Sequence, residues 1–218
     1  MTSPRFHPST ELLLDYASGA LERGRALVLS AHVASCAECC GQVRVAEAVG
    51  GALLAEATPA EMAPDALQRV LARIESQPTP PPGARSKGPQ RPDDWIWVPD
   101  EVLLAAERRK RWAAPGVWVA QVTRDRKTGA RSYLLGIGPV IAVPSHTHNG
   151  LEMVCVLKGA FKDRGHIYRP GDVAESDETI EHKPRVTREG DCVCLISADG
   201  PLRPRSWQAR LLQPLVGI

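Results

Sequence analysis

The chain has 218 residues, 43% of them hydrophobic and 24% charged, which is ordinary for a globular protein of one large or two modest domains. Its net charge of +2 gives no strong field toward nucleic acid or an acidic membrane, so neither partner is expected. No apolar run spans a bilayer and residues 1–8 lack the layout of a signal peptide, which predicts a cytoplasmic protein. In that reducing compartment the six cysteines are interpreted as metal ligands, redox groups or core residues rather than disulfides.

The first third of the chain is predicted to form three helices. Thr10 can cap the first helix, and Glu11 in its first turn favours the helix dipole. A second helix is expected over residues 22–34, and Ser35 is a plausible cap for a third helix over residues 37–55. Together they would form a small three-helix bundle with little core of its own.

Four side chains of the metal-ligand type lie in or just before these helices. His32 precedes Cys36 by four residues and Cys36 precedes Cys39 by three, so on a helix they share one face. His7, before the first helix, is the obvious fourth donor of a tetrahedral zinc site. Buried cysteines are often simple core residues, but the combined spacing favours zinc, which would also stabilise the small bundle. Cys40 is one residue out of phase and is interpreted as a spare thiol or a core residue.

A fourth amphipathic helix opens at Pro64 and is tethered to the bundle by residues 58–63. Its apolar stripe has the helical spacing i, i+3, i+4 and i+7 and consists of Leu67, Val70, Leu71 and Ile74. Burying four large aliphatic side chains is worth roughly 6–12 kcal/mol before opposing terms, so we expect the stripe to be covered. Two interpretations stay open: the helix packs on its own domain, or it contacts a partner protein.

Residues 77–92 are predicted to be a linker, because proline at this density disfavours helix and sheet and favours an extended spacer. The predicted domains are therefore a helical one over residues 1–76 and an all-β one over residues 93–218, which makes the chain an α+β multidomain protein. Short β-rich runs separated by glycines predict a sandwich or barrel in the second domain. The expected strands are residues 95–99, 117–123, 132–137, 152–157 and 192–196.

A second group of metal-type ligands lies inside the β region. His146 and His148 alternate on a strand and face the same way, and Glu152 shares that face if the strand continues. Two imidazoles and a carboxylate inside a small barrel are typical ligands of a divalent metal. His182 is the candidate fourth ligand, and His166 is a competing candidate.

Two cysteines near the end of the β region have strand spacing. Cys192 and Cys194 alternate, so their thiols face the same side. They form a candidate redox pair, in which one thiol attacks the sulfenic acid of the other. The alternative, that both are inert core thiols of the barrel, is favoured. Cys155 is assigned to packing.

The β domain resembles a cupin barrel. The residues that fall on the two cupin motifs are His146, His148, Glu152 and Gly159 for the first, and Pro170, Gly171 and His182 for the second. His182 follows Gly171 by eleven residues, whereas the second-motif histidine of the usual pattern follows its turn closely. The resemblance implies that this domain binds zinc or another divalent metal.

The helical domain resembles the zinc-binding anti-sigma domain, with His7, His32, Cys36 and Cys39 on its ligand pattern. The order of zinc-binding domain, proline-rich linker and cupin resembles the ChrR family of anti-sigma factors. This resemblance implies a regulator, not an enzyme, that clamps an extracytoplasmic-function sigma factor between its bundle and the fourth helix. The cupin domain would register an oxidant, singlet oxygen or a peroxide, and free the sigma factor.

An alternative function belongs to a different class. Many cupins are metal-dependent enzymes, dioxygenases among them, that use a similar set of four ligands. In that case the zinc-binding helical domain would be a docking module.

Overall fold

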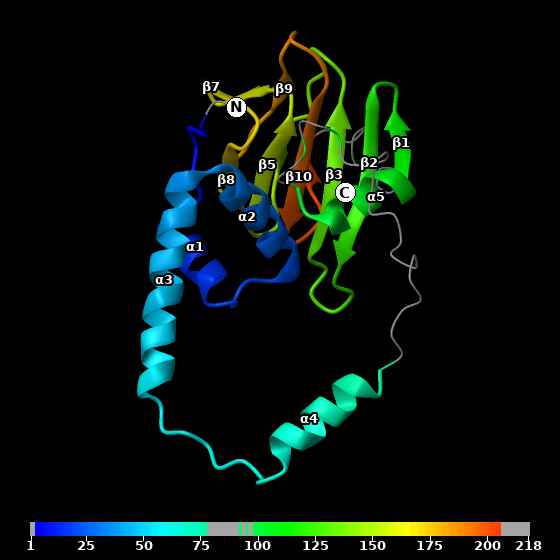
Figure 1. Cartoon of the computed structure of the whole chain (residues 1–218). Coiled ribbons are helices and arrows are strands. Elements are labelled where there is room, and N and C mark those ends of the chain that lie inside the picture. The colour runs from blue at the N-terminus through cyan, green and yellow to red at the C-terminus, as the bar shows by residue number, and fades with distance from the viewer. Residues whose placement is uncertain (1–2, 78–91, 93–94, 96–97, 206–218) are drawn as a thin grey trace.

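The computed structural model describes residues 3–77, 92, 95 and 98–205 of the chain. Within these residues all helices precede the strands, and the last helix, α5, comes directly before the first strand (Figure 1). The helices are α1 (Thr10–Ala17), α2 (Arg23–Ser35), α3 (Ala37–Glu56), α4 (Ala66–Glu75) and α5 (Asp100–Arg108). The linker predicted over residues 77–92 lies, except for its two end residues, outside the described residues.

Antiparallel pairing builds one large sheet and two small ones in the described part of the chain. The large sheet has the strand order β1-β2-β3-β10-β5-β8, and the small sheets have the orders β7-β6-β9 and β11-β4. The strands of the large sheet are β1 (Lys110–Ala114), β2 (Val117–Arg124), β3 (Arg131–Ile137), β5 (Glu152–Lys158), β8 (Val173–Ser176) and β10 (Cys192–Ala198). Those of the small sheets are β4 (His146–Thr147), β6 (Phe161–Asp163), β7 (His166–Tyr168), β9 (Arg185–Val186) and β11 (Arg203–Pro204).

The large sheet and the sheet β7-β6-β9 enclose a common interior. Tyr133 and Val156 of the large sheet belong to the same buried cluster as Phe161 and Val186 of the small sheet. Inward-facing side chains of both sheets therefore fill one core, as in a small barrel. The predicted order, helices followed by an all-β unit, matches what the structure describes.

The predicted strand over residues 95–99 is wrong for the three of its residues that the structure describes. Trp95 and Val98 lie in a turn closed by a hydrogen bond from Val98 N to Trp95 O, and helix α5 begins directly afterwards. Asp100 and Glu101 in its first turn favour the helix dipole, and Val102 is buried against the sheet. Sequence analysis missed α5 because one isolated helix of nine residues was not expected in a β-rich region.

Two predicted helix caps also differ from the structure. Ser9, with extended backbone angles, precedes α1 at the cap position assigned above to Thr10, which is itself the first helical residue. Ser35 is the last residue of α2, and its hydroxyl donates a hydrogen bond to the carbonyl of His32. Cys36 occupies the junction between α2 and α3 in an extended conformation, and its thiol side chain makes no capping hydrogen bond.

Helix α2 packs directly on the large sheet. Val28, Leu29 and Ala31 have no exposed surface, and they share a core cluster with Met153 and Leu195 of the sheet. The start of the helix comes so close that a Cβ on Gly24 would lie 2.9 Å from the Ser197 hydroxyl oxygen, so only glycine fits there. The helical and β parts therefore share one hydrophobic core rather than being joined by the linker alone.

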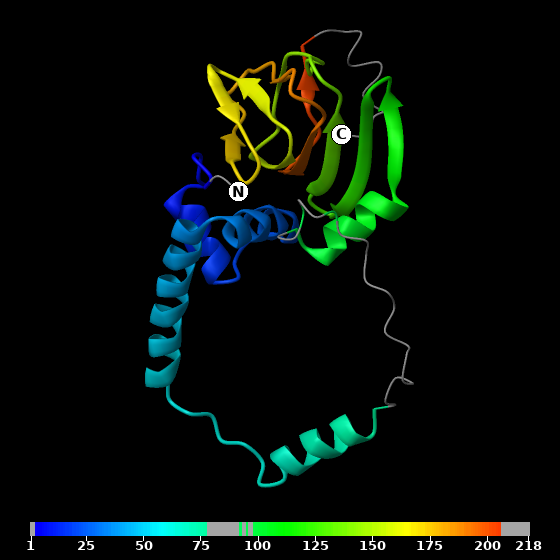
Figure 2. The same ribbon diagram turned by 45° about the horizontal axis from the view of Figure 1, so that its top comes forward.

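Helices α3 and α4 extend away from this core (Figure 2). Helix α3 contributes only Cys39 and Val43 to the buried set, both within its first seven residues. Helix α4 has no buried residue, and its apolar stripe Leu67, Val70, Leu71 and Ile74 is 49–65% exposed. The four side chains that we expect to be covered thus face solvent in the isolated chain.

Among the described residues no single helix is long and apolar enough to cross a membrane. Only α2 and α3 taken together, across a bend of 117° between them, have the length and composition of a span.

Two candidate metal centres

The first centre lies where α1, α2 and α3 meet, and we call it the helical centre. His7 comes from the segment before α1, His32 from α2, Cys36 from the α2–α3 junction and Cys39 from the first turn of α3. The four donor atoms all lie within 4.8 Å of one another. His7 Nδ1 is 3.5 Å from Cys36 Sγ and 3.4 Å from Cys39 Sγ. Tetrahedral zinc bonds to sulfur and nitrogen put those atoms about 3.6 Å apart, so the spacing fits a zinc ion.

The protonation pattern of the helical centre favours a bound cation. His32 Nδ1 donates a hydrogen bond to Gly171 O at 2.6 Å, which leaves the lone pair on Nε2. That Nε2 atom is buried and has no hydrogen-bond partner, which is costly for a polar atom unless a metal ion is bound. Burial lowers the pKa of His32, so the imidazole is held in the neutral form that binds metals.

The thiols of the helical centre also favour a bound cation. Burial, followed by the neighbouring Cys36, raises the pKa of the Cys39 thiol to about 12. The Cys39 thiol therefore stays protonated near neutral pH unless a compensating positive charge lies close to it. A divalent cation would supply that charge and release the thiol protons on binding.

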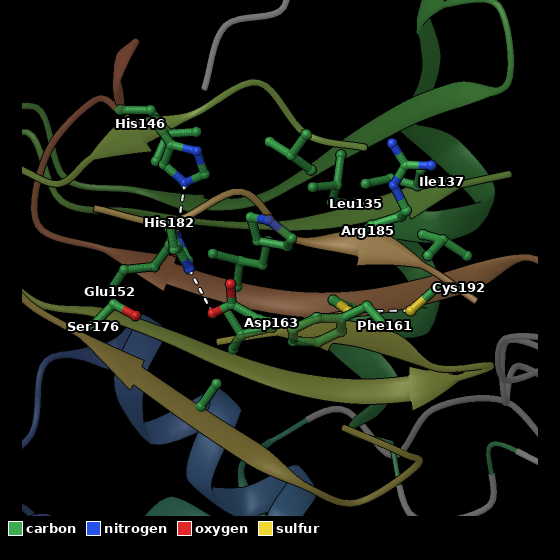
Figure 3. A pocket seen from close by; sticks show the side chains of 18 of the residues that line it. Leu135, Ile137, His146, Glu152, Phe161, Asp163, Ser176, His182, Arg185 and Cys192 are labelled. Atoms are coloured by element: carbon green, nitrogen blue, oxygen red, sulfur yellow. Dashed lines mark hydrogen bonds and ion pairs between the residues drawn. The ribbon is translucent and has the colours of Figure 1, made fainter. Parts of the chain in front are cut away.

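The second centre lies at one end of the barrel interior, and we call it the barrel centre (Figure 3). His146 lies on β4, His148 just after it, Glu152 at the start of β5, and His182 in the segment that pairs with His146. All four are 3–8% exposed, and their donor atoms lie within 4.8 Å of one another. His182 Nε2 is 3.0 Å from His146 Nε2 and 3.2 Å from His148 Nε2, and Glu152 Oε2 is 3.1 Å from His148 Nε2.

Each imidazole of the barrel centre directs its Nδ1 proton away from the other three donors. His146 Nδ1 donates to Pro144 O at 2.8 Å, and His148 Nδ1 donates to Asp177 O at 3.1 Å. In His146 the Nε2 lone pair therefore faces the group. Burial alone would lower the pKa of His148, but the hydrogen bond and charge of Glu152 raise it, and a divalent cation bound here would take the place of the proton between these two side chains. The donor set, nitrogen and carboxylate oxygen without sulfur, suits zinc, iron, manganese and similar divalent ions.

Asp163 orients the third imidazole, and sequence analysis did not identify it. His182 Nδ1 lies 2.8 Å from Asp163 Oδ2, which is buried at the end of β6 (Figure 3). Burial alone would raise the pKa of Asp163, but the hydrogen bond and charge of His182, with Arg164 nearby, lower it instead. The signal available in the sequence was the alternation of β6, in which Phe161 and Asp163 are buried on either side of an exposed Lys162.

The competing ligand His166 does not join the barrel centre. It is exposed on β7, and its ring packs against Phe6 with ring centroids 5.3 Å apart. The other predicted ligands of the β domain, His182 included, are brought together by the fold.

A small apolar cavity of about 70 Å³ adjoins the barrel centre. Its walls include Leu135, Ile137, Phe161, Val186 and Ile196, and the thiols of Cys192 and Cys194 also line it. These two sulfur atoms are 3.7 Å apart and both residues are buried. Hydrogen bonding to Cys192 and then burial raise the pKa of Cys194, which keeps that thiol protonated.

The remaining cysteines are placed as packing or surface residues. Cys155 is fully buried in the core shared with α2, and burial raises the pKa of its thiol. Cys40 is partly exposed on α3 and is outside the helical centre.

Fold and sites together define a class of protein: a cupin-type barrel with a helical metal-binding unit packed on its large sheet. Residues 102–202 match the ChrR cupin-like domain family. The chain is 36% identical to the anti-sigma-E factor ChrR of Cereibacter sphaeroides, over 98% of this chain and 99% of that protein. It is also similar to a chain in the crystal structure of Rhodobacter sphaeroides SigE in complex with the anti-sigma ChrR. That similarity has a TM-score of 0.71 and 32% identity, and it covers 90% of this chain and 100% of the other.

The chain therefore belongs to the ChrR family of anti-sigma factors. This membership confirms the predicted fold class, a helical unit followed by a cupin-like β domain. It does not favour the enzyme alternative, since both relatives named here are anti-sigma factors.

Proposed function

We propose that this protein is a zinc-dependent anti-sigma factor. It binds and inhibits an extracytoplasmic-function sigma factor and releases it when its cupin domain registers an oxidant. The observation that carries this function is the pairing of two complete metal-ligand groups with a sequence similar to the anti-sigma-E factor ChrR along almost its whole length. An inhibitor of a sigma factor must meet it where transcription takes place, which agrees with the predicted cytoplasmic location.

Two exposed apolar surfaces of the helical part are suited to hold the sigma factor. The first is a groove between α1 and α3, whose apolar lining is Leu14, Val45, Val49 and Leu53. These side chains are 54–67% exposed, which is unusual for so many aliphatic residues on one face. The second surface is the stripe of α4, Leu67, Val70, Leu71 and Ile74. A partner helix between the two would bury both and hide its own apolar face from RNA polymerase.

Zinc in the helical centre would set the shape of this clamp. The ion would tie His7, before α1, to Cys36 and Cys39 at the start of α3, and so fix the angle between the two helices that form the groove. The bundle has a small core cluster, in which Leu13 and Val43 pack beside the two cysteines. A structural zinc ion contributes folding free energy that such a core does not provide.

The barrel centre would hold zinc or another divalent ion through His146, His148, Glu152 and His182. These four side chains are 3–8% exposed, so an ion held by them would be shielded from the sigma factor, and its proposed role is sensing. An oxidant, singlet oxygen or a peroxide, would act on this centre or on the adjacent pair Cys192 and Cys194. Release of the sigma factor would follow from the change in the barrel.

Co-expression with the cognate sigma factor tests the zinc-dependent clamp. We expect a 1:1 complex with the unaltered chain and with Cys40→Ser, a matched control that removes a thiol outside the helical centre. Cys36→Ser should lose zinc, measured by elemental analysis, and weaken the complex at least tenfold, measured by calorimetry. A Cys36→Ser chain that binds the sigma factor as tightly as the control would refute the role of zinc.

A further inference from the structure

The two metal centres share one strand of the barrel. The carbonyl of Gly171, just before β8, accepts a hydrogen bond from His32 Nδ1 of the helical centre at 2.6 Å. The carbonyl of Asp177, just after β8, accepts a hydrogen bond from His148 Nδ1 of the barrel centre at 3.1 Å. The residues that flank the four-residue strand Val173–Ser176 thus orient one imidazole ligand of each centre.

The first end of β8 is packed tightly against the N-terminal segment. Gly171 has φ +92°, and a Cβ there would lie 2.8 Å from Pro4 Cγ, so a side chain would be both strained and crowded. The carboxylate of Asp172 accepts hydrogen bonds from the backbone N–H groups of Arg5 at 2.6 Å and Phe6 at 3.1 Å. The segment held in this way carries His7, so the Asp172 carboxylate helps to position that ligand. The carbonyl of the neighbouring Gly171 orients the second ligand, His32.

A second connection joins the other end of α2 to the barrel centre. Arg25 of α2 forms an ion pair with Asp199, which follows β10. The other oxygen of Asp199 accepts a hydrogen bond from Leu151 N at 2.9 Å. Leu151 lies between His148 and Glu152, so this contact fixes the loop that spaces two ligands of the barrel centre. Helix α2 therefore contacts the β part near both of its ends. Arg25 near its start pairs with Asp199, and His32 near its end bonds to the Gly171 carbonyl.

We propose that β8 and α2 couple the two centres, so that metal binding in the barrel raises the affinity of the helical centre for its own ion. A ligand histidine is oriented by the partner of its other nitrogen, and losing such a partner costs about 10–100-fold in metal affinity. A metal on His148 fixes that ring and the Asp177 end of β8, which in turn fixes the Gly171 carbonyl that orients His32. Coupling of this kind is reciprocal, and typical values are about 5–150-fold.

This inference deepens the proposed function, because it gives the barrel a route to the clamp. It depends on metal binding at both centres and does not depend on any contact with a sigma factor. The experiment therefore uses metal ions alone as probes.

Cobalt(II) distinguishes the two centres, because only the helical centre has thiolates and gives sulfur-to-metal charge-transfer absorption. Chelator competition followed at that absorption measures the affinity of the helical centre in the full-length chain. We expect His146→Ala, which removes a barrel ligand without touching β8, to lower this affinity at least fivefold. Equal affinities in the two proteins, within twofold, would overturn the proposal.

Two further variants test the route rather than the coupling alone. The Asp172→Ala Asp199→Ala chain loses the contacts of the barrel with the N-terminal segment and with Arg25 but keeps the His32–Gly171 hydrogen bond, so we expect His146→Ala to change the affinity of the helical centre by less than half of the factor seen in the unaltered chain. The Asp191→Ala chain, altered at an exposed aspartate of the same domain, should keep the full effect. An undiminished effect in the double variant would show that Asp172 and Asp199 are not part of the route.

Reciprocity gives an independent measurement if the double variant does not fold. Cys36→Ser should lower the affinity of the barrel centre by the same factor by which His146→Ala lowers that of the helical centre, and unequal factors refute the coupling. A chain that shows coupling but binds no sigma factor refutes the proposed function only. A chain that inhibits the sigma factor with independent metal affinities refutes this inference only.

Discussion

Single residues decide whether the barrel centre can hold an ion, because each of its imidazoles must keep a lone pair on the nitrogen that faces the group. Two of the three orienting partners are backbone carbonyls, of Pro144 and Asp177, which no side-chain substitution removes directly. The third partner is the carboxylate of Asp163, whose hydrogen bond to His182 is buried on both sides. Asp163 is therefore the position where the orientation of a ligand can be tested by substitution.

We predict that Asp163→Asn lowers the affinity of the barrel centre about 10–100-fold. The amide keeps the shape of the carboxylate but removes the charge that makes His182 a stronger ligand. Chelator competition on the full-length chain measures the change, and Asp191→Asn, at an exposed position, serves as the control. An Asp163→Asn chain with the affinity of the control would mean that His182 needs no orienting partner.

The two groups of candidate ligands that the fold brings together could be listed from the sequence, whereas their hydrogen-bond partners could not. His32, Cys36 and Cys39 lie within eight positions of the chain around the bend between α2 and α3, not on one helix face, and His146 and His148 are two positions apart, so short stretches bring each set together. Asp163 reaches His182 from 19 positions away, across strands whose register is set by the whole barrel. The carbonyl of Gly171 contacts His32 from 139 positions away and leaves no signal in side-chain type.

At the scale of elements, α4 differs from the other described helices because none of its residues is buried. Exposing an apolar stripe of this kind to water is unfavourable. Burying it against a partner stabilises the complex by about 1.5–3 kcal/mol for each fully buried side chain. The helix stands apart from the rest of the described chain in both views (Figures 1 and 2). Its stripe can therefore be altered without disturbing the core.

We predict that Leu71→Glu weakens sigma binding by at least tenfold and leaves the free energy of unfolding within about 0.5 kcal/mol of the unaltered chain. Leu71 is 49% exposed in the free protein, so a charge there costs little until the stripe is buried against a partner. Ala72→Glu adds the same charge to the side of α4 that faces away from the stripe, at an exposed position, and should bind normally. Calorimetry gives the affinity and urea unfolding gives the stability.

Equal losses of affinity in Leu71→Glu and Ala72→Glu would assign the effect to net charge and contradict a specific role for the stripe. A large loss of stability in Leu71→Glu would show instead that α4 packs on its own chain in solution, the other interpretation of its sequence.

Helical periodicity identified the apolar stripe of α4, but it carries no information about what covers such a stripe. Val28 and Ala31 repeat with the same spacing as Leu67 and Val70, yet the first pair is fully buried on the large sheet and the second is exposed. The difference arises from the tertiary arrangement, in which Gly24 lets α2 approach the sheet. Helix α5 was missed for a related reason, since its amphipathic pattern is short and lies beside strands.

At the scale of the whole molecule, the shared core changes how the two parts can be tested. Deleting the β part would expose Val28, Leu29 and Ala31, which have no exposed surface in the intact chain. Such a fragment would lose the burial of at least two large aliphatic side chains, about 3–6 kcal/mol, a large share of the stability of a small domain. Point substitutions in the barrel centre are therefore a cleaner test of the sensing role than a truncation.

We predict that His146→Ala still inhibits the sigma factor but responds weakly to oxidant. The coupling inferred above would cost the helical centre about fivefold in zinc affinity, or roughly 1 kcal/mol. Structural zinc sites of this ligand type bind with about 10–16 kcal/mol, so the helical centre would stay loaded and the clamp would keep its shape. A weak response is expected if the oxidant acts on the ion of the barrel centre rather than on Cys192 and Cys194, because this variant does not hold that ion. Release of the sigma factor after exposure to singlet oxygen or peroxide is measured by transcription from its target promoter.

His166→Ala is the matched control for this prediction, because it removes an exposed imidazole of the same domain that lies outside the barrel centre. It should both inhibit and respond like the unaltered chain. If His146→Ala released the sigma factor as readily as this control, the oxidant would be acting elsewhere, and the adjacent thiols of Cys192 and Cys194 would be the first place to look. If His146→Ala failed to inhibit at all, the zinc of the helical centre would depend on the barrel ion far more strongly than a fivefold coupling allows.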